Sequence, residues 1–263
     1  MDASAILERI AFRDEPAKSA EPIRARINVG TAGLCSECSL RHLCLTVGLD
    51  ALATKAFEQI VSARVRIGKG ETLFRPGEPF RALYAIRSGS CKSVLVTEEG
   101  REQVAGYHMR GEIVGIDGLS TRFHESEAVA LEDSEFCTLP FDRLEEFARR
   151  DARLQHGLHR LLAAEVARER NVMLMLGTMR AEQRLASFLL DLSRRYRDRG
   201  YSSTEFILRM TREEIGSFLG LKLETVSRLF SRFHQEGIVH VRGRTLKLVD
   251  PAALRQLVVA SLQ

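Results

Sequence analysis

The chain has 263 residues, of which 44% are hydrophobic and 28% charged, and its formal net charge is +4. This composition is that of a folded globular protein, and no apolar run is long enough for a membrane helix, so we expect no membrane partner. The charge is uneven, because residues 180–263 hold 15 Lys and Arg against 9 Asp and Glu. A basic C-terminal third favours a polyanionic partner.

The N-terminal residues 1–30 alternate acidic, basic and small side chains. They lack the apolar stretch of a secretory signal peptide, so we expect the protein in the cytoplasm. The segment also offers too little apolar surface to offset the entropy lost on ordering. Residues 1–30 are therefore predicted to be a disordered tail.

Three of the five cysteines form a C-x2-C-x5-C motif at Cys35, Cys38 and Cys44. An odd number of cysteines without an export signal argues against a disulfide framework. Thiolates select iron–sulfur clusters, zinc or copper(I), and a four-ligand site needs one more group. The candidates for it are Cys137, Cys91 and His42. Spacing alone leaves structural zinc, or three unconnected thiols, as alternatives to an iron–sulfur cluster.

The periodicity of the chain then changes twice. Residues 49–62 have apolar side chains at helical spacing. From Val65 to Leu139, short apolar runs such as LYAIRSG, CKSVLV and EQVAGYHM alternate with glycine-containing turns, which predicts a β-barrel or β-roll. From about Phe141 to Leu176 the chain reads as a long helix, either continuous or interrupted early.

Side chains at a 4-3-4-3-4-3 spacing mark one face of this long helix: Gln155, His159, Leu162, Val166, Glu169, Met173 and Leu176. Such a heptad seam is typical of a helix packed along a partner helix. We therefore predict a homodimer joined along this seam. The alternative is a helix that lies on its own domain.

The segment 210–250 predicts a helix-turn-helix followed by a wing. Thr211 and Glu214 form a T-x-x-E capping box, and Gly220 suits the end of a short first helix. A second helix is expected from about Leu223, followed by two short strands around Gly243.

The outer face of the second helix carries Glu224, Ser227 and Arg228. Arg228 can pair with a guanine and Glu224 can accept from a cytosine, while Ser227 lets the helix approach the bases. Phosphate contacts are expected from nearby basic side chains, namely Lys222, Arg232, Arg242, Arg244 and Lys247. We predict double-stranded DNA as the partner. The alternative is a small helical domain with a solvated charged face.

This order of β-roll, long helix and winged helix resembles the catabolite-activator superfamily of bacterial regulators. Four stretches resemble its fumarate and nitrate reduction (FNR) branch of oxygen sensors: C-x2-C-x5-C, ETLFRPGEPFRALYAIRSGS, FHESEAVALEDSEFCTLPF and MTREEIGSFLGLKLETVSRLFSRF. The resemblance covers roughly residues 31–257. It implies an α+β fold with a jelly-roll sensor domain of the cyclic-nucleotide-binding type (31–142), a dimerisation helix (143–179) and a winged helix-turn-helix DNA-binding domain (180–263).

The resemblance implies a [4Fe–4S] cluster held by Cys35, Cys38, Cys44 and Cys137, and leaves Cys91 as a buried structural thiol. In the FNR branch oxygen converts this cluster to a [2Fe–2S] form, the dimer weakens and DNA is released. The resemblance also implies a two-fold DNA site like TTGAT-N4-ATCAA, at which genes of anaerobic respiration are activated or repressed.

Glu169 stands in the seam, where members of the FNR branch carry an acidic residue. Two carboxylates that face each other across a dimer repel unless they are protonated or shielded. A weak dimer of this kind suits a switch, because a small bias then moves the population. The alternative is an exposed Glu169 paired with Arg168 or Arg170.

Nucleotide-binding relatives hold the phosphate with a glycine–glutamate stretch and an Arg-Ser pair. This chain offers Gly111-Glu112 but no Arg-Ser pair before the final strand of the roll. The residues found there, His124, Glu125 and Glu127, do not suit a phosphate, so we expect no cyclic nucleotide.

RNA polymerase is a further partner that the resemblance implies. The turn from Thr97 to Arg101 matches a loop through which family members contact the polymerase, with Thr97 and Gly100 as the candidate contacts. Arg101 replaces a residue that is usually acidic, which sets this turn apart from the family pattern.

Three other functions fit parts of the sequence. One is a regulator of the same architecture with a structural zinc or thiol-redox N-terminus. Another is an enzyme using His108, Asp117 and His124, but these lack the H-x-H pairing of cupin-type sites and no nucleophile with a base is evident, so we expect no enzyme. The third, a structural coiled coil, is disfavoured because the seam runs for only about three to four heptads.

Overall fold

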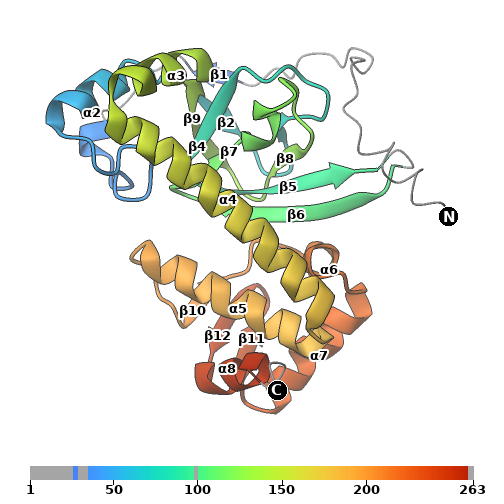
Figure 1. Cartoon of the computed structure of the whole chain (residues 1–263). Coiled ribbons are helices and arrows are strands. Elements are labelled where there is room, and N and C mark those ends of the chain that lie inside the picture. Colours follow the sequence, from blue (N-terminus) through green and yellow to red (C-terminus); the bar gives the residue numbers. More distant parts are fainter. Residues whose placement is uncertain (1–25, 29–34, 98–99, 260–263) are drawn as a thin grey trace.

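The computed structural model describes residues 26–28, 35–97 and 100–259. A β-roll with short helices around it forms one part, and a smaller helical part with a three-stranded sheet forms the other (Figure 1). One long helix, α4, runs from the roll to the smaller part (Figure 1). The α+β fold and the order of its parts are as predicted.

The N-terminal elements lie against one end of the roll. The 3-10 helix η1 (Cys35–Glu37) leads through turns to α2 (Ala51–Glu58), which begins where Asp50 accepts a hydrogen bond from the Ala53 N–H at 2.8 Å. The predicted helix over 49–62 is thus confirmed in a shorter form. The short strand β1 (Arg26–Asn28) pairs with β2, so the last part of the tail predicted to be disordered is a strand. Residues 1–25, 29 and 30 of that tail lie outside the described residues.

Two antiparallel sheets form the roll, with strand orders β1-β2-β9-β4-β7 and β3-β8-β5-β6. Their remaining strands are β2 (Ala63–Ile67), β3 (Thr72–Phe74), β4 (Ala82–Ser88), β5 (Ser90–Val96), β6 (Glu102–Met109), β7 (Ile113–Val114), β8 (Glu127–Ala130) and β9 (Ser134–Pro140). One core cluster of the roll buries Ile86 and Phe136 almost completely, and a second one buries Leu83 together with residues of the surrounding helices. The three apolar runs quoted above coincide with β4, β5 and β6, which confirms the predicted roll.

The predicted long helix is interrupted early. Helix α3 (Phe141–Arg150) ends at Asp151, whose backbone is extended at φ −125° and ψ 106°. The Asp151 carboxylate accepts from the N–H groups of Arg153 and Leu154 and so begins α4 (Ala152–Thr178). The segment expected to form the dimer helix, 143–179, therefore contains the end of α3 as well as α4.

The C-terminal part is a winged helix. It contains α5 (Ala181–Asp198), β10 (Glu205–Ile207), α6 (Arg212–Leu219), α7 (Leu223–Gln235), β11 (Val239–Arg242), β12 (Thr245–Leu248) and α8 (Pro251–Val259). Its three strands pair in the order β10-β12-β11. Leu185, Ile215 and Phe233 are fully buried between the helices. Among the helices described, none is both long and apolar enough to cross a membrane.

Candidate DNA interface and sensor site

The turn between α6 and α7 has the tight geometry that a helix-turn-helix requires. The Thr211 hydroxyl accepts from the Glu214 N–H at 3.1 Å, and the Glu214 carboxylate accepts from the Thr211 N–H at 2.6 Å. Gly220 ends α6 in the left-handed conformation at φ +63°. A Cβ on Gly216 would lie 2.6 Å from the Leu221 carbonyl oxygen, so the two helices can approach only with glycine there.

Helix α7 has one buried and one exposed face. Val226, Leu229, Phe230 and Phe233 are buried against the domain core. Glu224, Ser227 and Arg228 are exposed in its first two turns, as the sequence predicts. Their side chains are thus available on the face of the helix that would enter a major groove. Their contacts with bases remain predictions.

All five basic side chains predicted to bind phosphate are exposed around this helix. Lys222 precedes α7, and Arg242, Arg244 and Lys247 belong to the wing. Arg232 differs, because its guanidinium forms an ion pair with Glu182 of α5 and another with Glu236 at 3.5 Å. In this conformation Arg232 therefore serves to join two helices.

The sensor end of the roll brings four of the five cysteines into one region. Cys35 lies in η1, and Cys38 and Cys44 lie in the segment of turns that follows. Cys137 lies on the central strand β9, where it is paired with Arg64 of β2 and Ala85 of β4. Burial, reinforced by the neighbouring thiols of Cys44 and Cys137, raises the pKa of Cys35 to about 12. Burial likewise raises the pKa of Cys44 to about 11, with Cys137 and Cys38 close by.

The fifth cysteine is separate from this group. Cys91 is fully buried in β5, and the charged groups that influence it are Glu112 and Arg195 instead of another thiol. His42 is exposed. Within the described ranges, no three His, Cys, Asp or Glu side chains are already drawn together as a metal-ion site.

Two arginines provide positive charge beside Cys137. Burial raises the pKa of this thiol, and Arg64 and Arg87 act in the opposite direction. Nε and Nη2 of Arg64 are buried and have no hydrogen-bond partner among the described residues. Arg87 is paired with Glu135 at 3.2 Å, so the buried guanidinium of Arg64 is the less compensated positive charge beside Cys137.

Most of the predicted seam on α4 is exposed in the single chain, although Leu176 packs against the core of the DNA-binding domain. Leu162, Val166 and Met173 are 40%, 46% and 70% exposed. Glu169 is also exposed, and Arg168 pairs with Glu165 at 3.2 Å, so Arg168 is not the partner of Glu169. Leu162, Val166 and Glu169 also line a cavity between α4 and the roll, so the dimer seam stays a prediction beside the alternative of a helix that lies on its own domain.

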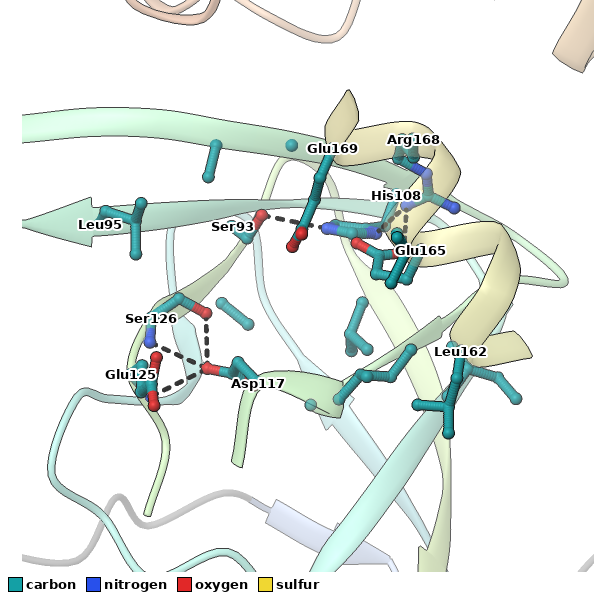
Figure 2. A pocket seen from close by; sticks show the side chains of 18 of the residues that line it. Ser93, Leu95, His108, Asp117, Glu125, Ser126, Leu162, Glu165, Arg168 and Glu169 are labelled. Carbon is teal, nitrogen blue, oxygen red and sulfur yellow. Dashed lines mark hydrogen bonds and ion pairs between the residues drawn. The ribbon is translucent and has the colours of Figure 1, made fainter. Parts of the chain in front are cut away.

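A cavity of about 490 Å³ lies between the roll and α4 (Figure 2). Its polar lining includes Ser93 and His108 from the roll, Asp117 and Glu125 from the loop between β7 and β8, and Glu165 and Glu169 from α4. His108 joins the two walls, because its Nε2 lies 3.1 Å from the Ser93 hydroxyl and its Nδ1 lies 3.2 Å from Nη1 of Arg168.

Comparison with known proteins identifies the family to which this chain belongs. Residues 64–151 match the model of the cyclic nucleotide-binding domain, and residues 183–257 match that of the Crp-like helix-turn-helix domain. The transcriptional regulatory protein btr of Bordetella pertussis is 46% identical over 86% of this chain and 94% of its own. The fumarate and nitrate reduction regulatory protein of Escherichia coli K12 is 40% identical over 87% and 91%. The chain belongs to the CRP/FNR family of bacterial transcription regulators.

A solved structure of the CRP/FNR family has the same fold. FixK2 from Bradyrhizobium japonicum superimposes with a TM-score of 0.69 at 31% identity, over 74% of this chain and 96% of that one. As a CRP/FNR member with a helix-turn-helix domain, the protein is a DNA-binding transcription regulator and not an enzyme. The resemblance inferred from the four sequence stretches is confirmed.

The structure corrects the position assigned to the nucleotide-binding glutamate of CRP/FNR relatives. Glu112 does not belong to the cavity lining, which instead includes Gly115 and Ile116. Its carboxylate is directed to the DNA-binding domain, where it pairs with Arg195 of α5 at 2.7 Å and with Arg199. The sequence interpretation was wrong because a Gly-Glu dipeptide does not by itself show which side of the chain the acid faces.

Sequence reasoning also missed the contact surface between the two domains. Lys92 of β5 pairs with Glu214 of α6 at 2.8 Å, and the rings of Tyr107, Phe188 and Phe218 contact one another. The residues of these pairs lie far apart in the chain, and no local spacing reveals them.

The residues of the enzyme alternative have structural partners: His108 contacts Arg168, and His124 contacts Asp117.

Proposed function

We propose that this protein is an oxygen-responsive transcription regulator in which Cys35, Cys38, Cys44 and Cys137 hold a [4Fe–4S] cluster. The observation that carries the proposal is the grouping of these four thiols, with Cys137 contributed by a distant strand, while Cys91 is held apart. The relative named for fumarate and nitrate reduction supports the same assignment.

The residues fit the proposed group chemically. Iron–sulfur clusters are held by four cysteine thiolates, and the region offers four. Arg64 provides positive charge where the bound thiolates and cluster would carry negative charge. When bound, the cluster would supply an oxygen-labile group. The chain's own part is to hold the four sulfurs between the N-terminal turns and β9, so that loss of the group would free these turns.

The exposed face of α4 supports a homodimer as the DNA-binding form. Two copies that pair along Leu162, Val166 and Met173 would bury side chains that are exposed in one chain. A two-fold dimer presents two α7 helices to a two-fold DNA site, for which TTGAT-N4-ATCAA is the proposed type. In the bacterial cytoplasm such a dimer would activate or repress genes of anaerobic respiration.

RNA polymerase is the proposed partner at activated promoters. Thr97 and Gly100 form a tight turn at the end of the β5–β6 hairpin, where the Gly100 N–H donates to the Thr97 carbonyl at 2.9 Å. The exposed position of this turn suits a protein contact.

Metal content before and after exposure to air tests the sensor assignment. Protein purified without oxygen should contain about four irons and four sulfides per chain and should lose both the cluster and DNA binding in air. Cys137→Ser should abolish the cluster, whereas Cys91→Ser is the matched control and should retain it. One zinc per chain, with DNA binding indifferent to air, would favour the zinc alternative. Such a result would leave the DNA-binding function intact.

A further inference from the structure

The carboxylate of Asp117 is surrounded by donors from one turn of the roll. Its Oδ2 accepts from the Glu125 N–H at 3.0 Å, the Ser126 N–H at 2.9 Å and the Ser126 hydroxyl at 2.8 Å. Its Oδ1 lies 3.3 Å from Nδ1 of His124. Figure 2 shows Asp117 directed toward Glu125 and Ser126 in the wall of the cavity.

The donor turn is held in place by contacts other than Asp117. His124 is only 3% exposed, and its ring stacks on Phe74 with centroids 3.8 Å apart. The His124 N–H donates to the Glu78 carbonyl at 2.9 Å, and its own carbonyl accepts from the Gly77 N–H at 2.8 Å. These contacts would keep the Glu125 and Ser126 N–H groups oriented if the Asp117 carboxylate were absent.

Backbone N–H groups of consecutive residues aimed at one point form an anion-binding nest. The nest formed by Glu125 and Ser126 belongs to the region that matches a cyclic nucleotide-binding domain, and it borders the cavity. We propose that Asp117 is a built-in anion, which occupies a cradle that would otherwise accept a phosphate or carboxylate from solution. The roll is then complete without an anionic ligand, and this inference does not depend on the cluster.

The rest of the cavity is consistent with an anion already in place. Glu125, Glu165 and Glu169 also line it, and Arg168 is engaged by Glu165. Burial lowers the pKa of His108 to about 3, so this ring is neutral at physiological pH. Although burial raises the pKa of Asp117, the hydrogen bonds from His124 and Ser126 outweigh it and keep the carboxylate ionised. A phosphate entering the cavity would meet several negative charges.

Asp117 could instead serve only to brace its loop. The two roles differ in what happens when the carboxylate is removed. A cradle left by Asp117→Ala should take up a small anion and regain stability, whereas a loop that has merely lost a brace should show no specific response to anions.

The test is chemical rescue in the full-length protein. Asp117→Ala should lower the thermal midpoint by on the order of 5–10 °C. Sodium formate, which matches the missing carboxylate in size and carries a single charge, should restore much of this loss with a saturable dose dependence. Sodium chloride at the same ionic strength should not, and the wild type should not respond. If Asp117→Ala does not fold in buffer, refolding from urea in formate or in chloride makes the same comparison.

Two variants control for non-specific effects. Asp117→Asn keeps the cradle filled, so formate should not rescue it. Asp133→Ala removes an exposed carboxylate that accepts a single hydrogen bond, from the Lys69 N–H at 3.0 Å, and should likewise show no rescue. The proposal is overturned if formate acts on Asp117→Ala no better than chloride does, or if it stabilises Asp117→Asn or Asp133→Ala equally.

Discussion

At the residue scale, single side chains on α7 are the proposed readers of the DNA sequence. Arg228→Ala should remove about 1–3 kcal/mol of discrimination at one base pair of each half-site, because a bidentate contact to guanine is lost. Binding to the preferred site would weaken while binding to a site altered at that base would change little. Fluorescence anisotropy with both duplexes measures the difference. Arg242→Ala is the contrast: as a phosphate contact it should weaken both duplexes equally and reduce the salt slope by about one.

Gly216 of α6, which approaches the turn to α7, allows a second test at the residue scale. Gly216→Ala places a Cβ 2.6 Å from the Leu221 carbonyl oxygen, which is backbone and cannot move without shifting the turn. We expect a destabilisation of about 1–3 kcal/mol in urea denaturation, together with weaker DNA binding. Gly177→Ala is the matched control, because nothing lies within 4 Å of its Cβ in α4. Its helix should become about 0.5–1 kcal/mol more stable.

The roles of some single residues could be predicted from the sequence, and those of others could not. The capping box of Thr211 and Glu214 and the exposed face of Arg228 follow from local spacing, and the structure has both. Arg232 was assigned to phosphate from its charge alone, yet it pairs with Glu182, which precedes it by 50 positions. Charge is visible in a sequence, but a partner from another helix is not.

At the scale of elements, α4 is the helix proposed to join the two copies of the dimer. Glu169→Ala should strengthen dimerisation of the cluster-free protein, because it removes a pair of facing carboxylates from the seam. Sedimentation velocity in air should then show more dimer, and DNA binding in air should rise. A variant that remains monomeric under these conditions would contradict the seam role of Glu169.

Two further variants serve as controls for the effect of Glu169→Ala on dimerisation. Val166→Glu adds a charge to the exposed apolar face of α4 and should reduce the dimer in the presence or absence of oxygen. Glu146→Ala removes an exposed acid from α3, outside the predicted seam, and should leave the dimer fraction unchanged.

The elements themselves were largely predictable, and for a physical reason. Glycine turns and apolar runs of fixed period specify β4, β5 and β6 locally, and the heptad spacing specifies α4. The break at Asp151 was left open, because an aspartate can cap a new helix or lie within one; its extended backbone and two accepted hydrogen bonds decide the matter.

At the scale of the whole molecule, the arrangement of the two domains could not be predicted. The contacts that set it join residues more than 80 positions apart, such as Arg195 with Glu112. The grouping of Cys137 with the N-terminal cysteines is also long-range. It was predicted because the family resemblance supplied it, whereas the spacing of the motif left Cys91 and His42 open as well.

The contribution of Glu112 to the domain arrangement can be tested directly. Its carboxylate, largely buried, faces Arg195 and Arg199 of the DNA-binding domain. Glu112→Gln leaves two arginines without their buried counter-charge and should destabilise the protein by about 3–5 kcal/mol. The exposed Glu213→Gln, on α6, is the control and should change stability little.

The pH dependence of this contact distinguishes a charged pair from a neutral hydrogen bond. Burial alone would raise the pKa of Glu112, but Arg195 and Arg199 outweigh it and lower the pKa from 4.5 to about 2. The carboxylate of the unfolded chain therefore takes up its proton first as the pH falls. The stability due to the pair is complete above about pH 4.5 and is lost between there and about pH 2. Urea unfolding of the wild type and Glu112→Gln should accordingly converge as the pH falls through this window. If the difference in unfolding free energy between the wild type and Glu112→Gln stays constant down to about pH 2, the carboxylate charge does not hold the two domains together.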